Sequence, residues 1–270
     1  MTEIRPYEPR RFRGAVPFYE RYRLGYPERL IRRVIALAGL VPGDAVLDLG
    51  TGPGLLAVPF AGAGMAVTAA DPEPDMLDAA SAAAEAAGVT LTLWRASSYD
   101  LTPQTGPFRM VTIGRAFHWM DRAATLAMLD RIVAPGGAVV FFHDAHPDTP
   151  ENRWFRVMRE VGDRYSKSDT AHVAERRANA HRRYEPFLFA SAFTMLDGLS
   201  VTFRQELTAD DIVGRAFSMS TCTPDKLDDR APAFEAELRA ALLPYETDGR
   251  FVEIAEMVAL MARRPATGQS

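Results

Sequence analysis

A glycine-rich loop is the first part of the sequence whose residue types and spacing indicate chemistry. It spans residues 48–54 and includes Asp48, Gly50, Thr51 and Gly52. Glycines directly after a buried strand let the backbone turn sharply and approach a ligand with no side chain in between. The loop therefore predicts a nucleoside-containing ligand, although any turn from a strand into a helix can use glycine for the same reason.

An acidic residue, Asp71, follows the loop at about the distance found in nucleotide-binding domains. At the end of a second strand, its carboxylate can accept hydrogen bonds from both ribose hydroxyls of a nucleoside. The same carboxylate can also cap a helix that starts at Pro72, and the two roles are compatible. The loop spacing is Gly-x-Gly-x-Gly, whereas dinucleotide-binding domains have Gly-x-Gly-x-x-Gly/Ala, which disfavours a nicotinamide cofactor.

Histidines near two later strand ends are candidates for proton transfer and acceptor binding. His118 follows a predicted fourth strand, and a histidine near neutral pH can remove a proton from a hydroxyl. Alternatively, His118 and its neighbours simply pack and start a helix. His143 and His146 flank the end of a fifth strand and are expected to line the acceptor pocket. Together with Asp144 they form His-Asp-x-His without further ligands, so we expect no metal site.

Hydrophobic periodicity shows which elements must position these residues. The predicted strands cover residues 45–49, 65–70, 89–94, 110–114 and 138–143, and the predicted helices cover 27–40, 53–63, 72–87 and 122–133. Strands alternating with helices form a parallel sheet with both faces covered, because parallel neighbours need a crossover. Ligands bind where the carboxyl ends of such strands meet, and the loop, Asp71 and the histidines all follow strand ends.

This alternation stops at about residue 148. Later elements are predicted as a strand over 200–207, helices over 209–219 and 231–242, and a strand or a helix over 251–261. The fold expected from all segments is α/β, a Rossmann-like, mostly parallel seven-stranded sheet with helices on both faces and an inserted helical cap. The expected domains are the N-terminal helices and core (1–147), the aromatic-rich cap (148–197) and the remainder of the core (198–270).

Composition restricts the class of protein and its partners. The chain has 270 residues, a formal net charge of −4 and a single cysteine, Cys222. One cysteine permits neither an intrachain disulfide nor a thiolate zinc cluster, and the net charge offers no general attraction for nucleic acid. There is no apolar run of membrane-spanning length and no secretory signal pattern. We therefore expect a cytoplasmic monomer or homodimer that acts on a small molecule, without a nucleic-acid or membrane partner.

Several segments together resemble the class I S-adenosylmethionine-dependent methyltransferases, in the broad subgroup that acts on small molecules. The matching segments are residues 18–27, 46–54 (similar to the first motif of the family), 71–77 (similar to the second), 114–121 and 133–137. The family more often has leucine where this chain has Val133. The resemblance covers about residues 10–145 well and the rest loosely.

The resemblance implies S-adenosylmethionine as cofactor and assigns its contacts. The methionine part is expected at Asp48, Gly50, Thr51 and Gly52, the ribose at Asp71, and the adenine at Pro72, Met76, Ser97, Ser98 and Tyr99. The family usually has an acidic residue where this chain has Tyr99. Tyr19 and Arg23 are expected near the cofactor carboxylate, since a guanidinium suits that group. Arg115 is the last of the expected cofactor-binding residues. A solvated arginine on a helix face is the alternative for Arg23.

The resemblance also implies methyl transfer to O, N or C of a small, apolar or aromatic secondary metabolite, as in antibiotic biosynthesis. Contacts to this acceptor are expected from His118, Trp119, His143, His146, Trp154 and Tyr184, with His118 as candidate base. A base is optional, because such enzymes mainly position the reactants and exclude water. Two alternatives remain open: a protein of this fold without methyl transfer, serving as a cyclase or binding protein, and a nicotinamide-dependent oxidoreductase.

Overall fold

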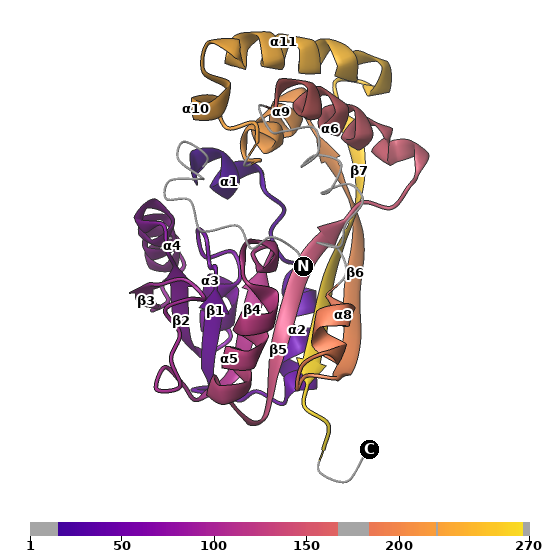
Figure 1. The fold of residues 1–270 in the computed structure, drawn as a ribbon. Helices are drawn as coiled ribbons and strands as arrows, with labels where there is room; N and C mark the ends of the chain where they lie inside the picture. Colours follow the sequence, from indigo (N-terminus) through magenta and orange to yellow (C-terminus); the bar gives the residue numbers. More distant parts are fainter. Residues whose placement is uncertain (1–15, 167–183, 220, 267–270) are drawn as a thin grey trace.

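A seven-stranded sheet organises the chain (Figure 1). The computed structural model describes residues 16–166, 184–219 and 221–266. The strands are β1 (Ala45–Leu49), β2 (Ala66–Asp71), β3 (Thr92–Arg95), β4 (Phe108–Gly114), β5 (Val133–Ala145), β6 (Met195–Leu207) and β7 (Phe251–Arg263), in the spatial order β3-β2-β1-β4-β5-β7-β6. The first five are parallel, and β7 runs antiparallel to both β5 and β6. The predicted mostly parallel α/β sheet is confirmed.

Helices cover both faces of this sheet, each through its own apolar cluster. On one face α2 (Glu28–Ala38) and α3 (Ala57–Gly62) bury side chains such as Leu30 and Phe60. On the other face α5 (Arg122–Ile132) and α8 (Glu185–Phe189) bury Leu129 and Leu188. The helix α4 (Pro74–Ala86) packs along β2 and β3. The two faces are therefore closed, and the ends of the strands are left for a site.

Local sequence explains where most of these elements begin and end. The helix α2 places its buried residues Leu30, Ile31 and Val34 at helical spacing and ends at Gly39, whose φ of 63° is left-handed. Asp121 caps α5 by accepting a hydrogen bond from the Ala124 amide. In β7 buried and half-buried residues alternate over most of its length, which settles the open choice in favour of a strand.

Several predicted boundaries differ from the structure. The fifth strand, β5, covers Val133–Ala145 rather than 138–143, and β6 starts at Met195 rather than at residue 200. The helix predicted over 53–63 starts only at Ala57, because Gly54 has a φ of 83° and continues the turn. The strand predicted over 89–94 starts at Thr92, and no helix joins β3 to β4. The step from β3 to β4 therefore crosses the sheet by a loop.

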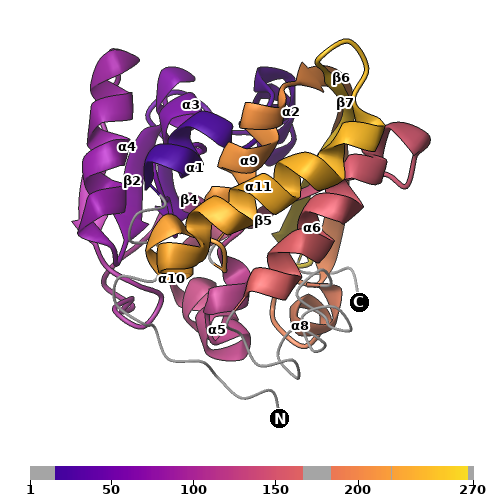
Figure 2. The ribbon, with the colours of Figure 1, turned by 90° about the horizontal axis from the view of Figure 1, so that it is seen from above.

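A group of helices forms a lid above the carboxyl ends of the parallel strands (Figures 1 and 2). Its members are α1 (Val16–Tyr22), α6 (Arg153–Tyr165), α9 (Ala209–Phe217), α10 (Pro224–Leu227) and α11 (Ala231–Leu242). Four 3-10 turns complete the described elements: η1 (Phe117–Trp119), η2 (Pro150–Asn152), η3 (Asp228–Arg230) and η4 (Leu243–Tyr245). An apolar cluster of its own, which includes Trp154, Phe217 and Phe234, holds α6, α9 and α11 together.

Besides α1, the lid draws on two segments of the chain, which differs from the predicted division. Residues 198–270 were assigned to the core, yet α9, α10 and α11 lie in the lid with α6. Within the predicted cap 148–197, α8 packs on the sheet instead. The reason is the long hairpin of β6 and β7, whose strands extend past β5 and lead the intervening helices to the lid. Residues 167–183 of the predicted cap lie outside the described residues.

Side chains from the start of the lid cover the extended part of β7. The pairing of β7 with β5 stops at Glu256, so residues 251–255 pair with β6 alone. On the open side, the Trp154 indole N–H donates to Val252 O at 2.8 Å, and the Asn152 side chain bonds both the amide and the carbonyl of Ile254. These bonds satisfy an otherwise open strand edge and fix the lid to the sheet.

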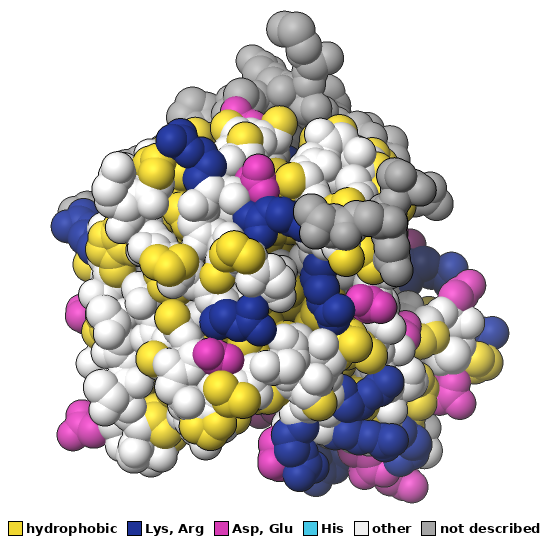
Figure 3. All heavy atoms as spheres, turned by 90° about the horizontal axis from the view of Figure 1, so that it is seen from below, with side chains coloured by type: hydrophobic (Ala, Val, Ile, Leu, Met, Phe, Trp, Pro, Cys, Tyr) yellow, Lys and Arg dark blue, Asp and Glu magenta, His cyan; other side chains and the backbone are white. Residues whose placement is uncertain are grey.

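The face opposite the lid shows no single-sign patch. Arginines and carboxylates lie intermixed with apolar side chains over the described part of that face (Figure 3). Within the described residues, no helix has both the length and the apolar character that crossing a membrane requires.

The separate core of the lid leads to a stability prediction. Phe234 in α11 is fully buried against Phe217, so Phe234→Ala should lower the free energy of unfolding by about 3–5 kcal/mol. Phe189 is 61% exposed, so Phe189→Ala should change the free energy of unfolding by less than about 0.5 kcal/mol. Urea titration followed by circular dichroism measures both values, and equal losses would contradict an independent apolar core in the lid.

Candidate functional site

Two adjoining hollows lie at the carboxyl edge of the parallel strands. The large hollow has an empty volume of about 880 Å³ and the small one about 260 Å³. The large hollow is lined by Tyr19, Leu49, Gly50, Gly52, Asp71, Pro72, Glu73, Met76, Ala96, Ser97, Ser98, Tyr99, Gly114, Arg115, Ala116, Trp119 and Met120. The small hollow is lined by Tyr19, Tyr26, Asp48, Gly50, Thr51, Gly52, Leu55, Leu56, Gly114 and Arg115. Their shared residues make them one candidate site.

The glycine loop forms the wall between the two hollows. Gly50 and Gly52 have φ values of 75° and 55°, which side-chain-bearing residues rarely adopt. A Cβ at Gly50 would lie 2.6 Å from the Ala116 Cβ, so the loop packs tightly there. A Cβ at Gly52 would meet no atom of the described residues within 4 Å, because Gly52 borders the open space. The loop thus exposes backbone to a ligand, as its spacing predicts.

Asp71 ties the loop to the end of β2. Its Oδ2 accepts a hydrogen bond from the Gly52 amide at 2.9 Å, and its Oδ1 accepts one from the Glu73 amide at 3.0 Å. Burial raises the pKa of Asp71 to about 6, although both amide bonds act in the opposite direction. The residue at the N-cap position of α4 is Glu73, so Asp71 is not the helix cap considered above.

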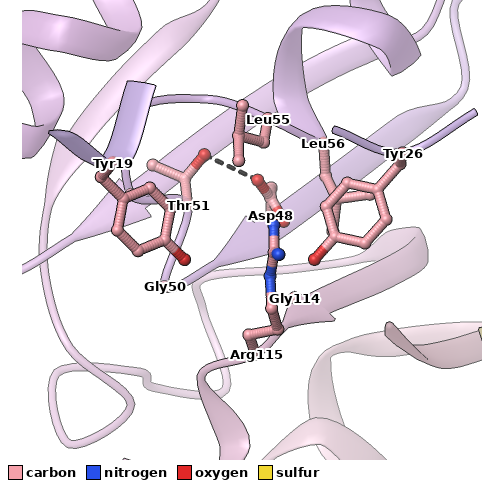
Figure 4. A pocket seen from close by; sticks show the side chains of 10 residues that line it. Tyr19, Tyr26, Asp48, Gly50, Thr51, Leu55, Leu56, Gly114 and Arg115 are labelled. Atoms are coloured by element: carbon pink, nitrogen blue, oxygen red, sulfur yellow. Dashed lines mark hydrogen bonds between the residues drawn. The ribbon is translucent and has the colours of Figure 1, made fainter. Parts of the chain in front are cut away.

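Asp48 lies on the floor of the small hollow (Figure 4). Its carboxylate accepts hydrogen bonds from the Thr51 hydroxyl at 2.6 Å and from the Thr112 hydroxyl at 2.7 Å. Its side chain is almost entirely buried, and this burial raises its pKa to about 6. Two neighbouring carboxylates with raised pKa values are a feature of functional sites rather than of ordinary cores.

Tyrosine rings and guanidinium groups close the opposite side of the small hollow. Figure 4 shows Tyr19 and Tyr26 on either side of Arg115. The Arg115 Cζ lies 4.9 Å from the Tyr26 ring centroid and 5.9 Å from that of Tyr19, and the Arg23 Cζ lies 5.0 Å from the Tyr19 ring. Among the described residues, the buried Nε atoms of both arginines have no hydrogen-bond partner. Arg23 is thus not a solvated helix residue.

Arg115 has an unusual backbone. Its φ of 55° is in the left-handed region, which is rare for arginine and often found at functional sites. Its amide donates to Phe142 O at 2.9 Å, and its side chain donates to Leu24 O at 3.0 Å and to Asp144 at 3.4 Å. These bonds hold the guanidinium at the meeting point of β4, β5 and the segment after α1.

The far end of the large hollow has an apolar character. Pro72 and Met76 line it together with Trp119. The Ser97 amide and hydroxyl both donate to Asp100, which fixes the turn that also brings Ser98 to the lining. Such a mixture of flat apolar surface and a few polar groups suits a heteroaromatic ring. Sequence reasoning missed Leu49, Glu73, Ala96, Gly114, Ala116 and Met120 in the large hollow and Tyr26, Leu55 and Leu56 in the small one. Most of them are close neighbours of the predicted contacts in the chain.

Six of the predicted site residues do not line either hollow. His118 lies in η1 with its ring 4.4 Å from that of Trp119, and His143 packs edge-on to Tyr184, 6.1 Å away. Tyr184 is buried in the apolar cluster beneath α5, and burial raises its pKa to about 12. Trp154 and His146 lie at the base of the lid, where His146 stacks on Phe155 at 3.8 Å between ring centroids. Arg23 also lies outside the lining, behind Tyr19.

A buried charged cluster next to these residues was missed in the sequence. Glu253 of β7 is completely buried and accepts hydrogen bonds from both terminal nitrogens of Arg215 of α9 and from Gln205. Burial alone would raise the pKa of Glu253. These hydrogen bonds and the one with His146 outweigh burial and lower this pKa to about 2. A glutamate at an inward position of an alternating strand, between Phe251 and Ala255, was the available signal.

The described residues contain no group of three or more His, Cys, Asp or Glu side chains arranged to hold a metal ion. The side chains that line the hollows supply the carboxylates of Asp48, Asp71 and Glu73, the guanidinium of Arg115 and aromatic rings, beside exposed backbone.

Comparisons with known proteins agree with this geometry. Residues 46–137 match the family model of a methyltransferase domain. An uncharacterized methyltransferase of Mycobacterium tuberculosis is 34% identical over 152 residues, 56% of this chain and 58% of the relative. The chain thus spans less than two thirds of that curated relative.

Solved structures share the fold at low sequence identity. A methyltransferase of Geobacter sulfurreducens, solved with S-adenosylhomocysteine, has a TM-score of 0.52 at 17% identity and covers 96% of this chain and 99% of its own. One from Thiobacillus denitrificans, also solved with S-adenosylhomocysteine, has a TM-score of 0.51 at 18% identity and covers 95% and 99%. Residues 46–137 thus match a methyltransferase domain, and the described fold is the one found in these solved methyltransferases.

Proposed function

We propose that the chain transfers a methyl group from S-adenosylmethionine to an oxygen, nitrogen or carbon atom of a small, apolar or aromatic acceptor. The observation that supports this most directly is the glycine loop bonded to Asp71, with Gly52 exposed to the hollow. From the resemblance to small-molecule enzymes we also propose a role in secondary metabolism, such as antibiotic biosynthesis, by a cytoplasmic monomer or homodimer.

The hollows fit S-adenosylmethionine along their length. Asp71 has a carboxylate at the rim, and two of its oxygen lone pairs are used by backbone amides, which leaves capacity for the ribose hydroxyls. Pro72, Met76, Ser97, Ser98 and Tyr99 surround the space proposed for the adenine. Asp48, Thr51, Tyr19 and Arg115 surround the small hollow proposed for the amino-acid end. Arg23 supports Tyr19 from behind.

Methyl transfer depends more on the positioning of the two reactants than on a catalytic side chain. The cofactor supplies an electrophilic methyl on a sulfonium; the acceptor atom forms a bond to this carbon as the carbon–sulfur bond breaks. The lid and the aromatic lining exclude water from this displacement. For a hydroxyl acceptor a proton must leave, and we propose His118 as its base, with Trp119, His143 and Tyr184 near the acceptor. His146 and Trp154, predicted as acceptor contacts, have structural partners in β7 instead.

The first prediction concerns the cofactor. Isothermal titration calorimetry should detect S-adenosylhomocysteine binding and no binding of NAD. Asp71→Ala should weaken the binding of S-adenosylhomocysteine by at least about tenfold, or about 1.4 kcal/mol, through lost ribose hydrogen bonds. Asp78→Ala, an exposed change in α4, the helix that follows β2, is the control and should have no effect. Binding of NAD alone would indicate an oxidoreductase, and binding without turnover would favour a cyclase or a binding protein.

The second prediction concerns pH. Asp48 and Asp71 both have pKa values raised to about 6, so both are largely protonated at pH 5 in the free protein. A ligand that presents an ammonium and donating hydroxyls favours the ionised forms, so binding releases protons and tightens as pH rises through 6. We expect the dissociation constant of S-adenosylhomocysteine to be roughly tenfold larger at pH 5 than at pH 7.5. Asp71→Asn should reduce this dependence, and a flat wild-type profile would refute the prediction.

The third prediction concerns His118. His118→Asn should slow turnover of a hydroxyl acceptor by roughly 100-fold while leaving cofactor affinity unchanged, since a general base typically contributes about that much. Single-turnover kinetics with each candidate acceptor provide the measurement. Full activity of the variant would make His118 a packing residue of η1 and remove it from the mechanism.

A further inference from the structure

A buried ion pair connects the lid to the sheet outside both hollows. Arg215 is 6% exposed in α9, and Glu253 is fully buried in β7, 38 positions away in the chain. Their contact is bidentate, with the Arg215 Nη2 to Glu253 Oε2 distance at 3.1 Å. Replacing such a buried pair with apolar residues often leaves stability unchanged, because burial of the charges offsets their attraction. Stability alone therefore does not account for the pair.

One set of contacts leads from this pair to Tyr19. The Arg215 Nε–H donates to the carbonyl of Tyr22 at 3.3 Å, at the last residue of α1. A Cβ at Gly214 would lie 2.3 Å from the Tyr22 ring, so α1 rests directly on the backbone of α9. The Arg23 guanidinium adds a bond to Ser218 O at 3.3 Å. Helix α1 buries no residue of its own, so these contacts with α9 hold Tyr19, about one turn earlier, over the hollows.

A second set of contacts leads to Arg115. His146 Nε2 lies 2.7 Å from the Glu253 Oε1, and His146 Nδ1 lies 4.0 Å from the Asp144 carboxylate. Asp144 in turn pairs with Arg115 at 3.4 Å. Burial would raise the pKa of Asp144, but Arg115 and Arg23 outweigh it and lower that pKa to about 2, so Asp144 is ionised. The connection therefore runs from Glu253 past the His146 ring to Asp144 and ends at Arg115, a side chain that lines both hollows.

We propose that Arg215 and Glu253 are positioning residues for the cofactor site, acting through α1 on Tyr19 and through His146 and Asp144 on Arg115. This inference rests on the proposed function, because it assumes that the hollows bind S-adenosylmethionine. Apolar residues in place of the pair can fill its volume, but they cannot reach the Tyr22 carbonyl or hold His146. Loss of the pair should therefore weaken cofactor binding more than it weakens folding.

The test compares cofactor affinity with thermal stability in matched variants of the full chain. In R215M/E253M the melting temperature should stay close to that of the wild type, while the dissociation constant of S-adenosylhomocysteine should rise at least tenfold. The control R164M/E237M removes an ion pair between α6 and α11 in the same lid and should leave the constant unchanged. Arg215→Lys keeps the ion pair but lacks the Nε–H that reaches Tyr22, so it should raise the constant about threefold.

The outcomes separate the inference from the proposed function. Wild-type affinity in both R215M/E253M and Arg215→Lys would overturn the positioning role. Equal weakening in R164M/E237M would also overturn it, because the effect would then belong to the lid in general. If the double variant does not fold, Arg215→Lys decides alone. Failure of the wild-type chain to bind S-adenosylhomocysteine would instead refute the proposed function.

Discussion

The hydrogen bond from the Gly52 amide to the Asp71 carboxylate is the interaction on which the site depends. It fixes the loop after β1 against the end of β2, the neighbouring strand, and the second oxygen of the same carboxylate holds the Glu73 amide ahead of α4. A carboxylate has about four acceptor positions, so two remain for a ligand. One side chain therefore shapes the loop, aligns the start of a helix and keeps hydrogen-bonding capacity at the rim of the hollow.

The lid is possible because β7 extends beyond β5, one of the two strands that pair with it. An extended strand with one open edge exposes amides and carbonyls that must find partners. Asn152 and Trp154 provide these partners from the segment that enters α6, and Glu253 faces inward toward α9 from the same stretch of strand. The two segments that form the lid thus meet at the same few residues of β7. A lid built on the longest strands of the sheet has a fixed place relative to the loop.

Local patterns predicted the sheet, most helices and the loop, because strand alternation, helical spacing and glycine turns are determined by neighbouring residues. The lid could not be derived in this way. Its helices pack through contacts such as that of Tyr165 in α6 with Phe234 in α11, and Arg215 ties α9 to Glu253 in β7. The partners in these contacts are far apart in the sequence or have no pattern of their own. His146 was placed near the acceptor because it follows the fifth strand, and Trp154 because it belongs to the aromatic-rich cap. In the structure β5 continues to Ala145, and both side chains bond to β7 at the base of the lid.

The distribution of charge along the hollows distinguishes between nucleotide ligands. A dinucleotide would bring its pyrophosphate to the glycine loop and the start of the next helix. Here Asp48 lies directly beneath the loop, and a buried carboxylate at that place would repel a phosphate. Helix α3 begins only at Ala57, so the backbone that follows the loop is a turn rather than a helix N-terminus. Carboxylates at the loop, guanidiniums beside Tyr19 and an apolar wall at Met76 instead match a ligand with an ammonium, a carboxylate and a flat base in that order.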